Sequence, residues 1–185
     1  MKIIFPIAFT LFFIFIDKNV EENQKNIEGK PFFDFDEVLH YEIPISEEIY
    51  RELVLEEGSF EKVKHLQILL ENSCPNTEEE NIQFETAINS IEKIATTIDS
   101  KYYSEFRNKI FSEKKCDVVS SRKCGPIYRD IFIFKKNNKQ TGMAKICFEC
   151  RLYSFSKGNF NSNCFGMNGE FRSLKKIISE NKKLK

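Results

Sequence analysis

Through the first half of the chain, hydrophobic residues recur every three or four positions, the spacing of a helix with one buried face. The longest such stripe comprises Phe84, Ile88, Ile91, Ala95 and Ile98. It follows Thr77–Glu80, which has the pattern of a capping box, and the two together predict a helix. Shorter stripes predict helices after Ser46, after Ser59 and over Ser100–Ser112. One strand is expected before them, at Glu37–Ile43.

The pattern changes to alternation in the second half of the chain. Ile127–Phe134 and Met143–Cys150 are rich in β-branched and aromatic residues, and the polar segment Lys135–Gly142 connects them. We therefore predict a β-hairpin over residues 127–151 that turns near Asn137–Asn138.

Two further elements complete the predicted fold. Ser154–Gly169 is rich in Gly, Asn and Ser, which indicates an exposed loop. Glu170–Lys183 has apolar residues on one side and lysines elsewhere, as in an amphipathic closing helix. The fold class expected is α+β, with N-terminal helices, an antiparallel sheet around the hairpin and a C-terminal amphipathic helix.

The N-terminus has the pattern of an export signal. Lys2 precedes the apolar run Ile3–Ile16, which as a helix reaches about 21 Å and is too short for the roughly 30 Å hydrocarbon core of a membrane. No small-x-small triplet follows it, so an uncleaved anchor and a buried core segment remain alternatives. The expected organisation is a signal peptide or uncleaved leader at 1–16, a flexible tether at 17–30, and a single α+β domain at 31–185. Within that domain, 31–112 is helical and acidic, and 113–185 is β-rich and basic.

Charge is distributed unevenly along a chain whose net charge is zero. Asp17–Ser100 carries 21 acidic and 7 basic residues, whereas Lys101–Lys185 carries 20 basic and 7 acidic residues. Either the two halves pack together and neutralise each other, or a basic face contacts an anionic partner. The partner expected is an unknown protein or an anionic envelope surface. Export argues against nucleic acid, and membrane contact is expected only through an uncleaved leader.

An exported chain meets an oxidising compartment, so its cysteines are expected to form disulfides. The six candidates are Cys74, Cys116, Cys124, Cys147, Cys150 and Cys164. A hairpin turning at Asn137–Asn138 pairs residues whose numbers sum to about 276, which brings Cys150 within diagonal reach of Cys124. A local Cys116–Cys124 bridge is the competing choice. Six cysteines allow 15 pairings, and the sequence does not select one.

The sequence Cys147-Phe148-Glu149-Cys150 could instead carry chemistry. On a strand, residues three apart point to opposite faces with Cα atoms about 10 Å apart, which disfavours a shared metal or a mutual bridge. No helix begins there to lower the pKa of a thiol. No metal site and no cofactor are therefore expected. The alternative is a thiol site formed by Cys147, Cys150 and His40, the histidine that could meet the cysteines if its strand joins the sheet.

The segment Cys124–Ile178 resembles small uncharacterised bacterial exported or lipoprotein-like proteins. The resemblance rests on Cys124-Gly-Pro-Ile-Tyr-Arg-Asp-Ile-Phe-Ile-Phe, then Lys-Ile-Cys-Phe-Glu-Cys, then Asn163–Leu174. It implies two strands, the second carrying CFxC, before a terminal helix. Such proteins often have a lipid-attachment cysteine after the leader, where this chain has Asp17-Lys18. The resemblance implies no known activity and no site residue.

The sequence contains no phosphate loop, nucleophile elbow or HExxH motif, so it favours a non-enzymatic role without settling whether the chain is an enzyme. The function expected is a disulfide-stabilised interaction or structural module of the bacterial envelope, periplasmic or extracellular, and tethered if the leader is uncleaved. Its expected contact surface is the loop Ser154–Gly169 with the basic C-terminal face. The alternative is a thiol-redox or metal-binding protein using Cys147 and Cys150.

Overall fold

The predicted hairpin forms the centre of the structure, a computed structural model that describes residues 29–56, 58–116 and 124–183. Strand β3 (Asp130–Lys136) pairs with β4 (Lys139–Cys147), and both turn residues adopt left-handed backbone conformations, with φ of 50° at Asn137 and 62° at Asn138. Asparagine tolerates this conformation better than most residues, which is why Asn-Asn suits a two-residue hairpin turn. Phe132 faces Ala144, the register expected from the turn, and the register shifts at Phe134/Lys135.

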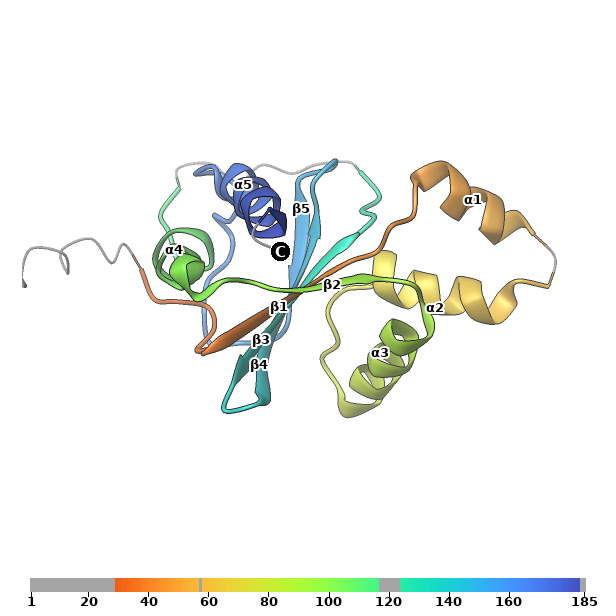
Figure 1. Ribbon diagram of the computed structural model, residues 1–185, viewed down its shortest axis with the longest axis horizontal. Coiled ribbons are helices and arrows are strands. Elements are labelled where there is room, and N and C mark those ends of the chain that lie inside the picture. Colours follow the sequence, from red (N-terminus) through yellow and green to blue (C-terminus); the bar gives the residue numbers. More distant parts are fainter. Residues whose placement is uncertain (1–28, 57, 117–123, 184–185) are drawn as a thin grey trace, which may run out of the picture.

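Three further strands extend the hairpin into a five-stranded sheet (Figure 1). They are β1 (Glu37–Glu42), β2 (Ile94–Thr97) and β5 (Leu152–Phe155). The order across the sheet is β2-β1-β3-β4-β5, and all neighbouring strands are antiparallel. The predicted α+β class with an antiparallel sheet around the hairpin is confirmed.

Helices cover both faces of this sheet (Figure 1). One face packs against α1 (Glu47–Leu55), α2 (Phe60–Leu70) and α3 (Glu78–Ser90). The other face packs against α5 (Glu170–Lys182) and a helical segment with three geometries. This segment comprises the 3₁₀ turn η1 (Ser100–Tyr102), α4 (Tyr103–Glu105) and the π-helical turn η2 (Phe106–Ile110). None of the helices in the described segments is both long and apolar enough to cross a bilayer.

The start of α3 is fixed by the capping box expected from the sequence. The Thr77 side chain accepts from the amide of Glu80, and the Glu80 carboxylate accepts from the amide of Thr77, both at 3.2 Å. Ser46 caps α1 in a similar way. Ser59 stands at the N-cap of α2 without a side-chain hydrogen bond, and Phe60, the first residue of α2, is 81% exposed.

The sequence prediction was wrong at the end of the long apolar stripe. The helix α3 stops at Ser90, and Ile94–Thr97 form the edge strand β2. Thr96 and Thr97 pair with β1, where the β-branched residues of this segment fit an extended backbone. Apolar spacing alone could not reveal this change, because Ile98 is buried in either conformation.

Phenylalanine dominates the core on the α5 face of the sheet. Phe111 lies at its centre, with ring centroids 4.9 Å from Phe134 and 5.8 Å from Phe165. Phe33 stacks on Phe134 at 4.4 Å and lies directly over Gly142. Edge-to-face and stacked ring pairs of this kind stabilise a core beyond the area that they bury.

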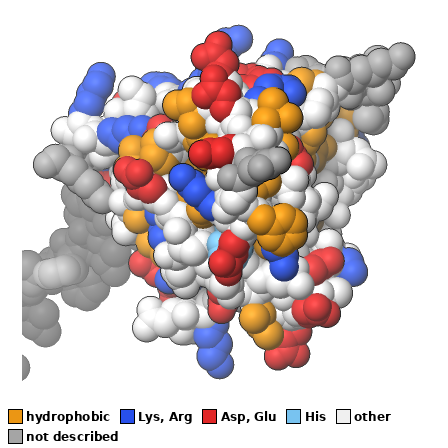
Figure 2. Space-filling model, turned by 90° about the vertical axis from the view of Figure 1, so that its right-hand side faces the viewer, with side chains coloured by type: hydrophobic (Ala, Val, Ile, Leu, Met, Phe, Trp, Pro, Cys, Tyr) orange, Lys and Arg blue, Asp and Glu red, His pale blue; other side chains and the backbone are white. Residues whose placement is uncertain are grey.

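Charge separates across the sheet. The segment Glu47–Ser90, Glu57 aside, carries ten carboxylates and three basic side chains, and its helices lie on one face. Ser100–Cys116 and Glu170–Lys182 together carry nine basic and four acidic residues and lie on the other face. Ion pairs such as Lys182 with Glu42 join the two halves of the chain at the sheet. On the α1–α3 side, acidic and hydrophobic side chains share the surface (Figure 2).

The segments assigned to a leader and to most of the tether, residues 1–16 and 17–28, lie outside the described residues. They remain predictions.

The contact between Gly142 and Phe33 yields a stability prediction. A Cβ at Gly142 would lie 2.1 Å from a ring carbon of Phe33, so Gly142→Ala must displace that ring within a packed core. We expect a loss of about 1–3 kcal/mol in the free energy of unfolding, measured by urea denaturation. Gly125→Ala is the matched control, because a Cβ there meets nothing within 4 Å. Equal stability of the two variants would contradict this account of the core.

Candidate functional site

The sequence Cys147-Phe148-Glu149-Cys150 lies at the end of a strand and in the turn that follows it. Cys147 is the last residue of β4, the next four residues form a turn, and β5 begins at Leu152. Arg151 adopts φ of 52°, a left-handed conformation that non-glycine residues adopt less often. The amide of Cys150 donates to Sγ of Cys147 at 3.4 Å. The prediction that both cysteines lie within one strand was therefore wrong, because the chain reverses here to form β5.

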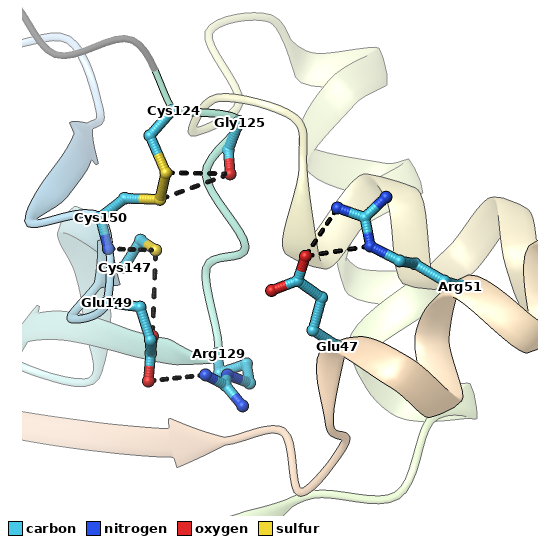
Figure 3. Close-up of a disulfide and its surroundings, with 8 residues drawn as sticks. All are labelled: Glu47, Arg51, Cys124, Gly125, Arg129, Cys147, Glu149 and Cys150. Carbon is cyan, nitrogen blue, oxygen red and sulfur yellow. Dashed lines mark hydrogen bonds and ion pairs between the residues drawn. A yellow bond between two sulfur atoms is a disulfide. The ribbon is translucent and has the colours of Figure 1, made fainter.

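Two disulfides join distant segments of the domain. Cys124 pairs with Cys150, with Cα atoms 6.0 Å apart, as the hairpin register allows (Figure 3). Cys116 pairs with Cys164, with Cα atoms 5.6 Å apart, so the local Cys116–Cys124 bridge is not formed. The domain is thus disulfide-stabilised, and such bridges are typical of proteins in oxidising compartments.

The remaining two cysteines, Cys74 and Cys147, are thiols in the core and belong to no disulfide, contrary to the expectation for all six. Each is only 1% exposed. The Cys74 thiol donates to the carbonyl of Ser154 at 3.2 Å, and burial raises the pKa of this thiol to about 11. Such a group is neither readily ionised nor accessible to a reagent.

His40 does not complete a site with the cysteines. Its strand, β1, does join the hairpin, but the His40 ring stacks on Phe132 in the core of the α5 face, with centroids 4.7 Å apart. Its Nε2 donates to Asp130 at 2.8 Å. Cys147 belongs to the set of β4 residues that face α2 and α3, because side chains alternate along the strand. The residues of the alternative thiol site, Cys147, Cys150 and His40, are therefore not assembled on one face.

A buried lysine lies among the helices on the Cys147 face. Lys145 is fully buried, and its Nζ donates to the carbonyls of Ile68 at 2.7 Å and Asn72 at 2.9 Å, at the end of α2. It supplies the positive charge that a helix C-terminus favours. Burial lowers the pKa of Lys145 to about 8, and the neighbouring Cys74 thiol opposes this shift. A single lysine within the apolar run Met143–Cys147 was the sequence signal for this group, and our sequence analysis did not use it.

A cavity of about 860 Å³ opens where α5 begins, at the end of the loop Ser154–Gly169. The residues that line it are mostly polar or basic: Asn108, Lys109, Lys114, Lys115, Asn168, Glu170 and Ser173. We call it the basic pocket. Glu170 is buried and pairs with Lys114, whereas Lys109 and Lys115 are exposed and pair with no carboxylate among these lining residues. The adjacent Cys116–Cys164 disulfide fixes the Lys115 segment against the loop.

Across the residues described, no three His, Cys, Asp or Glu side chains are grouped so as to hold a metal ion. Comparisons with protein-family models, with curated proteins and with solved structures gave no match. Inference about function therefore depends on the geometry of the chain itself.

The buried Lys145 yields a pH prediction. Because its pKa in the folded protein is about 8 and that of an unfolded lysine is about 10.4, the unfolded chain binds more protons between these values. The contribution of Lys145 to the free energy of unfolding therefore increases as pH rises from 8 to 10, by up to about 1.4 kcal/mol per pH unit.

The measurement compares the free energy of unfolding of the protein that has Lys145 with that of the Lys145→Met variant, by urea denaturation at pH 7 and pH 10. Both proteins carry Cys74→Ala, because the Cys74 thiol has a raised pKa and would contribute the opposite slope. We expect the stability of the lysine protein relative to the methionine variant to be greater at pH 10. An unchanged difference would show that Lys145 titrates normally.

Proposed function

We propose that the protein is an exported, non-enzymatic interaction module that binds an anionic surface of the bacterial envelope through its basic pocket. The observation that carries this proposal is the cavity of about 860 Å³ lined by Lys109, Lys114 and Lys115. It lies where the sequence predicted a contact surface, between the loop Ser154–Gly169 and the basic C-terminal face.

The charges of the pocket support an anionic ligand. The Lys114 charge is neutralised by Glu170, which leaves Lys109 and Lys115 to attract a partner. Exposed lysines near one another attract anionic lipid headgroups by about 1 kcal/mol each. The Cys116–Cys164 disulfide links the segment that contains Lys114 and Lys115 to the loop Ser154–Gly169. This link restricts movement of the lysines, so less entropy is lost when a ligand binds.

Export is supported by two features of the chain. The basic and apolar N-terminus has the pattern of a leader, and the two disulfides are consistent with an oxidising compartment. The proposed location is periplasmic or extracellular.

The competing function, thiol-redox chemistry at Cys147 and Cys150, has one observation in its favour, the 3.4 Å contact between the Cys150 amide and Cys147 Sγ. Against it, Cys147 is buried, Cys150 is bonded to Cys124, and His40 lies on the other face of the sheet.

Thiol alkylation followed by mass measurement distinguishes these functions. The native protein is expected to take up no iodoacetamide, the denatured protein two groups, at Cys74 and Cys147, and the denatured and reduced protein six. Rapid alkylation of Cys147 in the native protein would favour the redox function instead.

The basic pocket is tested by co-sedimentation with vesicles. The full chain is expected to bind phosphatidylglycerol vesicles but not phosphatidylcholine vesicles, and binding should weaken as salt is added. The double variant Lys109→Glu/Lys115→Glu is expected to bind at least tenfold more weakly, from about 1 kcal/mol per lysine.

The matched control is Lys62→Glu/Lys64→Glu on α2, which makes the same change of charge on the opposite side of the sheet. If both double variants lose binding equally, overall charge and not the basic pocket is responsible, and the proposal fails.

A further inference from the structure

A second cavity lies on the opposite side of the sheet from the basic pocket, between α1 and the segment before β3. It has a volume of about 600 Å³ and is lined by Tyr50, Arg51, Val54, Leu55, Glu71, Gly125, Pro126 and Ile127. We call it the α1 groove. Its volume falls within the range of about 300–1,000 Å³ that is usual for ligand sites.

Helix α1 presents apolar side chains at this groove that no described part of the chain covers. Leu55 is 84% exposed and Val54 is 45% exposed, and Tyr50 is the one buried residue of the helix. Neighbouring exposed apolar residues of this kind mark interaction sites more often than single ones do.

Tyr50 joins α1 to the core beside the groove. Its side chain is 3% exposed. Burial and the interaction with the neighbouring Glu71 carboxylate raise the pKa of the Tyr50 hydroxyl, so this hydroxyl stays protonated next to Glu71.

The wall opposite α1 is fixed in place. The disulfide at Cys124 holds one end of the segment Gly125–Ile127 (Figure 3). At the other end, the amide of Tyr128 donates to the carbonyl of Leu70 at 2.7 Å. A preformed site of this kind loses little entropy when it binds a ligand.

Among the described residues, the charge around the groove is negative. Glu48 and Glu52 on α1 and Glu56 just after it are exposed, and Glu71 lines the groove. Arg51, the cation among the described lining residues, donates twice to Glu47 at 2.6 and 2.9 Å, so it is already neutralised (Figure 3). Acidic side chains beside hydrophobic ones are visible on this side of the molecule (Figure 2).

We propose that the α1 groove binds a cationic amphipathic helix of a partner protein. The apolar side chains of such a helix pack on Val54, Leu55 and Ile127, and its lysines or arginines lie over the surrounding carboxylates. This surface is separate from the basic pocket and does not depend on the function proposed for it.

The test is isothermal titration of the full chain with synthetic 14-residue peptides. The probe contains Leu and Lys arranged so that all leucines lie on one face of a helix. A second peptide has the same composition in scrambled order, and a third has every Lys replaced by Glu. Only the first is expected to bind with 1:1 stoichiometry, and more weakly at high salt.

The double variant Val54→Ser/Leu55→Ser is expected to weaken binding of the first peptide at least tenfold. The control Ile82→Ser, on α3 at a site 59% exposed and outside the groove, is expected to leave the affinity unchanged. Because these side chains are exposed, the variants should fold normally, which circular dichroism checks. Glu52→Gln/Glu56→Gln should weaken binding and reduce its salt dependence, whereas Glu85→Gln on α3 should not.

Three results would overturn the proposal: no binding of the Leu/Lys peptide, equal binding of the scrambled or Leu/Glu peptide, or the same affinity for the Val54/Leu55 variant as for the unaltered protein. Because the vesicle assay uses other residues and another probe, either proposal can fail while the other stands.

Discussion

The register between β3 and β4 determines which side chains face each side of the sheet and where Cys150 lies. With Phe132 opposite Ala144, the even-numbered residues of β4 up to Ile146 face the phenylalanine core, and Met143, Lys145 and Cys147 face α2 and α3. A shift of one residue would move Lys145 into the phenylalanine core, where no helix carbonyl could accept from it. The same register brings Cys150 to Cys124 and so fixes the wall of the α1 groove. The Asn137–Asn138 turn therefore influences groups well beyond the hairpin.

Much of the fold could be predicted because the patterns involved are local. Alternation with a two-residue turn specified the hairpin, and a capping box specified the start of α3. The same reasoning failed at Ile94–Thr97, since pairing with β1 outweighed apolar spacing that suits a helix. It also failed at Phe148–Cys150, because a turn there depends on β5 returning along β4.

The candidate sites were harder to predict, because each is assembled from segments distant in the sequence. The basic pocket combines residues 108–115 with residues 168–173, and the α1 groove combines residues 50–55 with residues 125–127. Tertiary packing brings these segments together, with the Lys114–Glu170 ion pair and the Cys116–Cys164 disulfide at the basic pocket, and cysteine spacing allowed 15 pairings. The uneven distribution of charge along the chain was visible in the sequence. The sequence did not show that the acidic helices and the basic helices lie on opposite faces of one shared sheet.

The burial of Cys74 and Cys147 has a consequence for how the chain is oxidised. In the unfolded chain all six thiols can react, whereas in the folded domain these two lie within the core and out of reach of disulfide exchange. The native pairs are thus selected when the sheet closes around these two thiols, because only the other four remain at the surface or in turns. Correct oxidation then follows folding of the sheet. In a chain oxidised before the sheet forms, Cys74 and Cys147 can enter non-native disulfides, and such a disulfide prevents these residues from packing in the core.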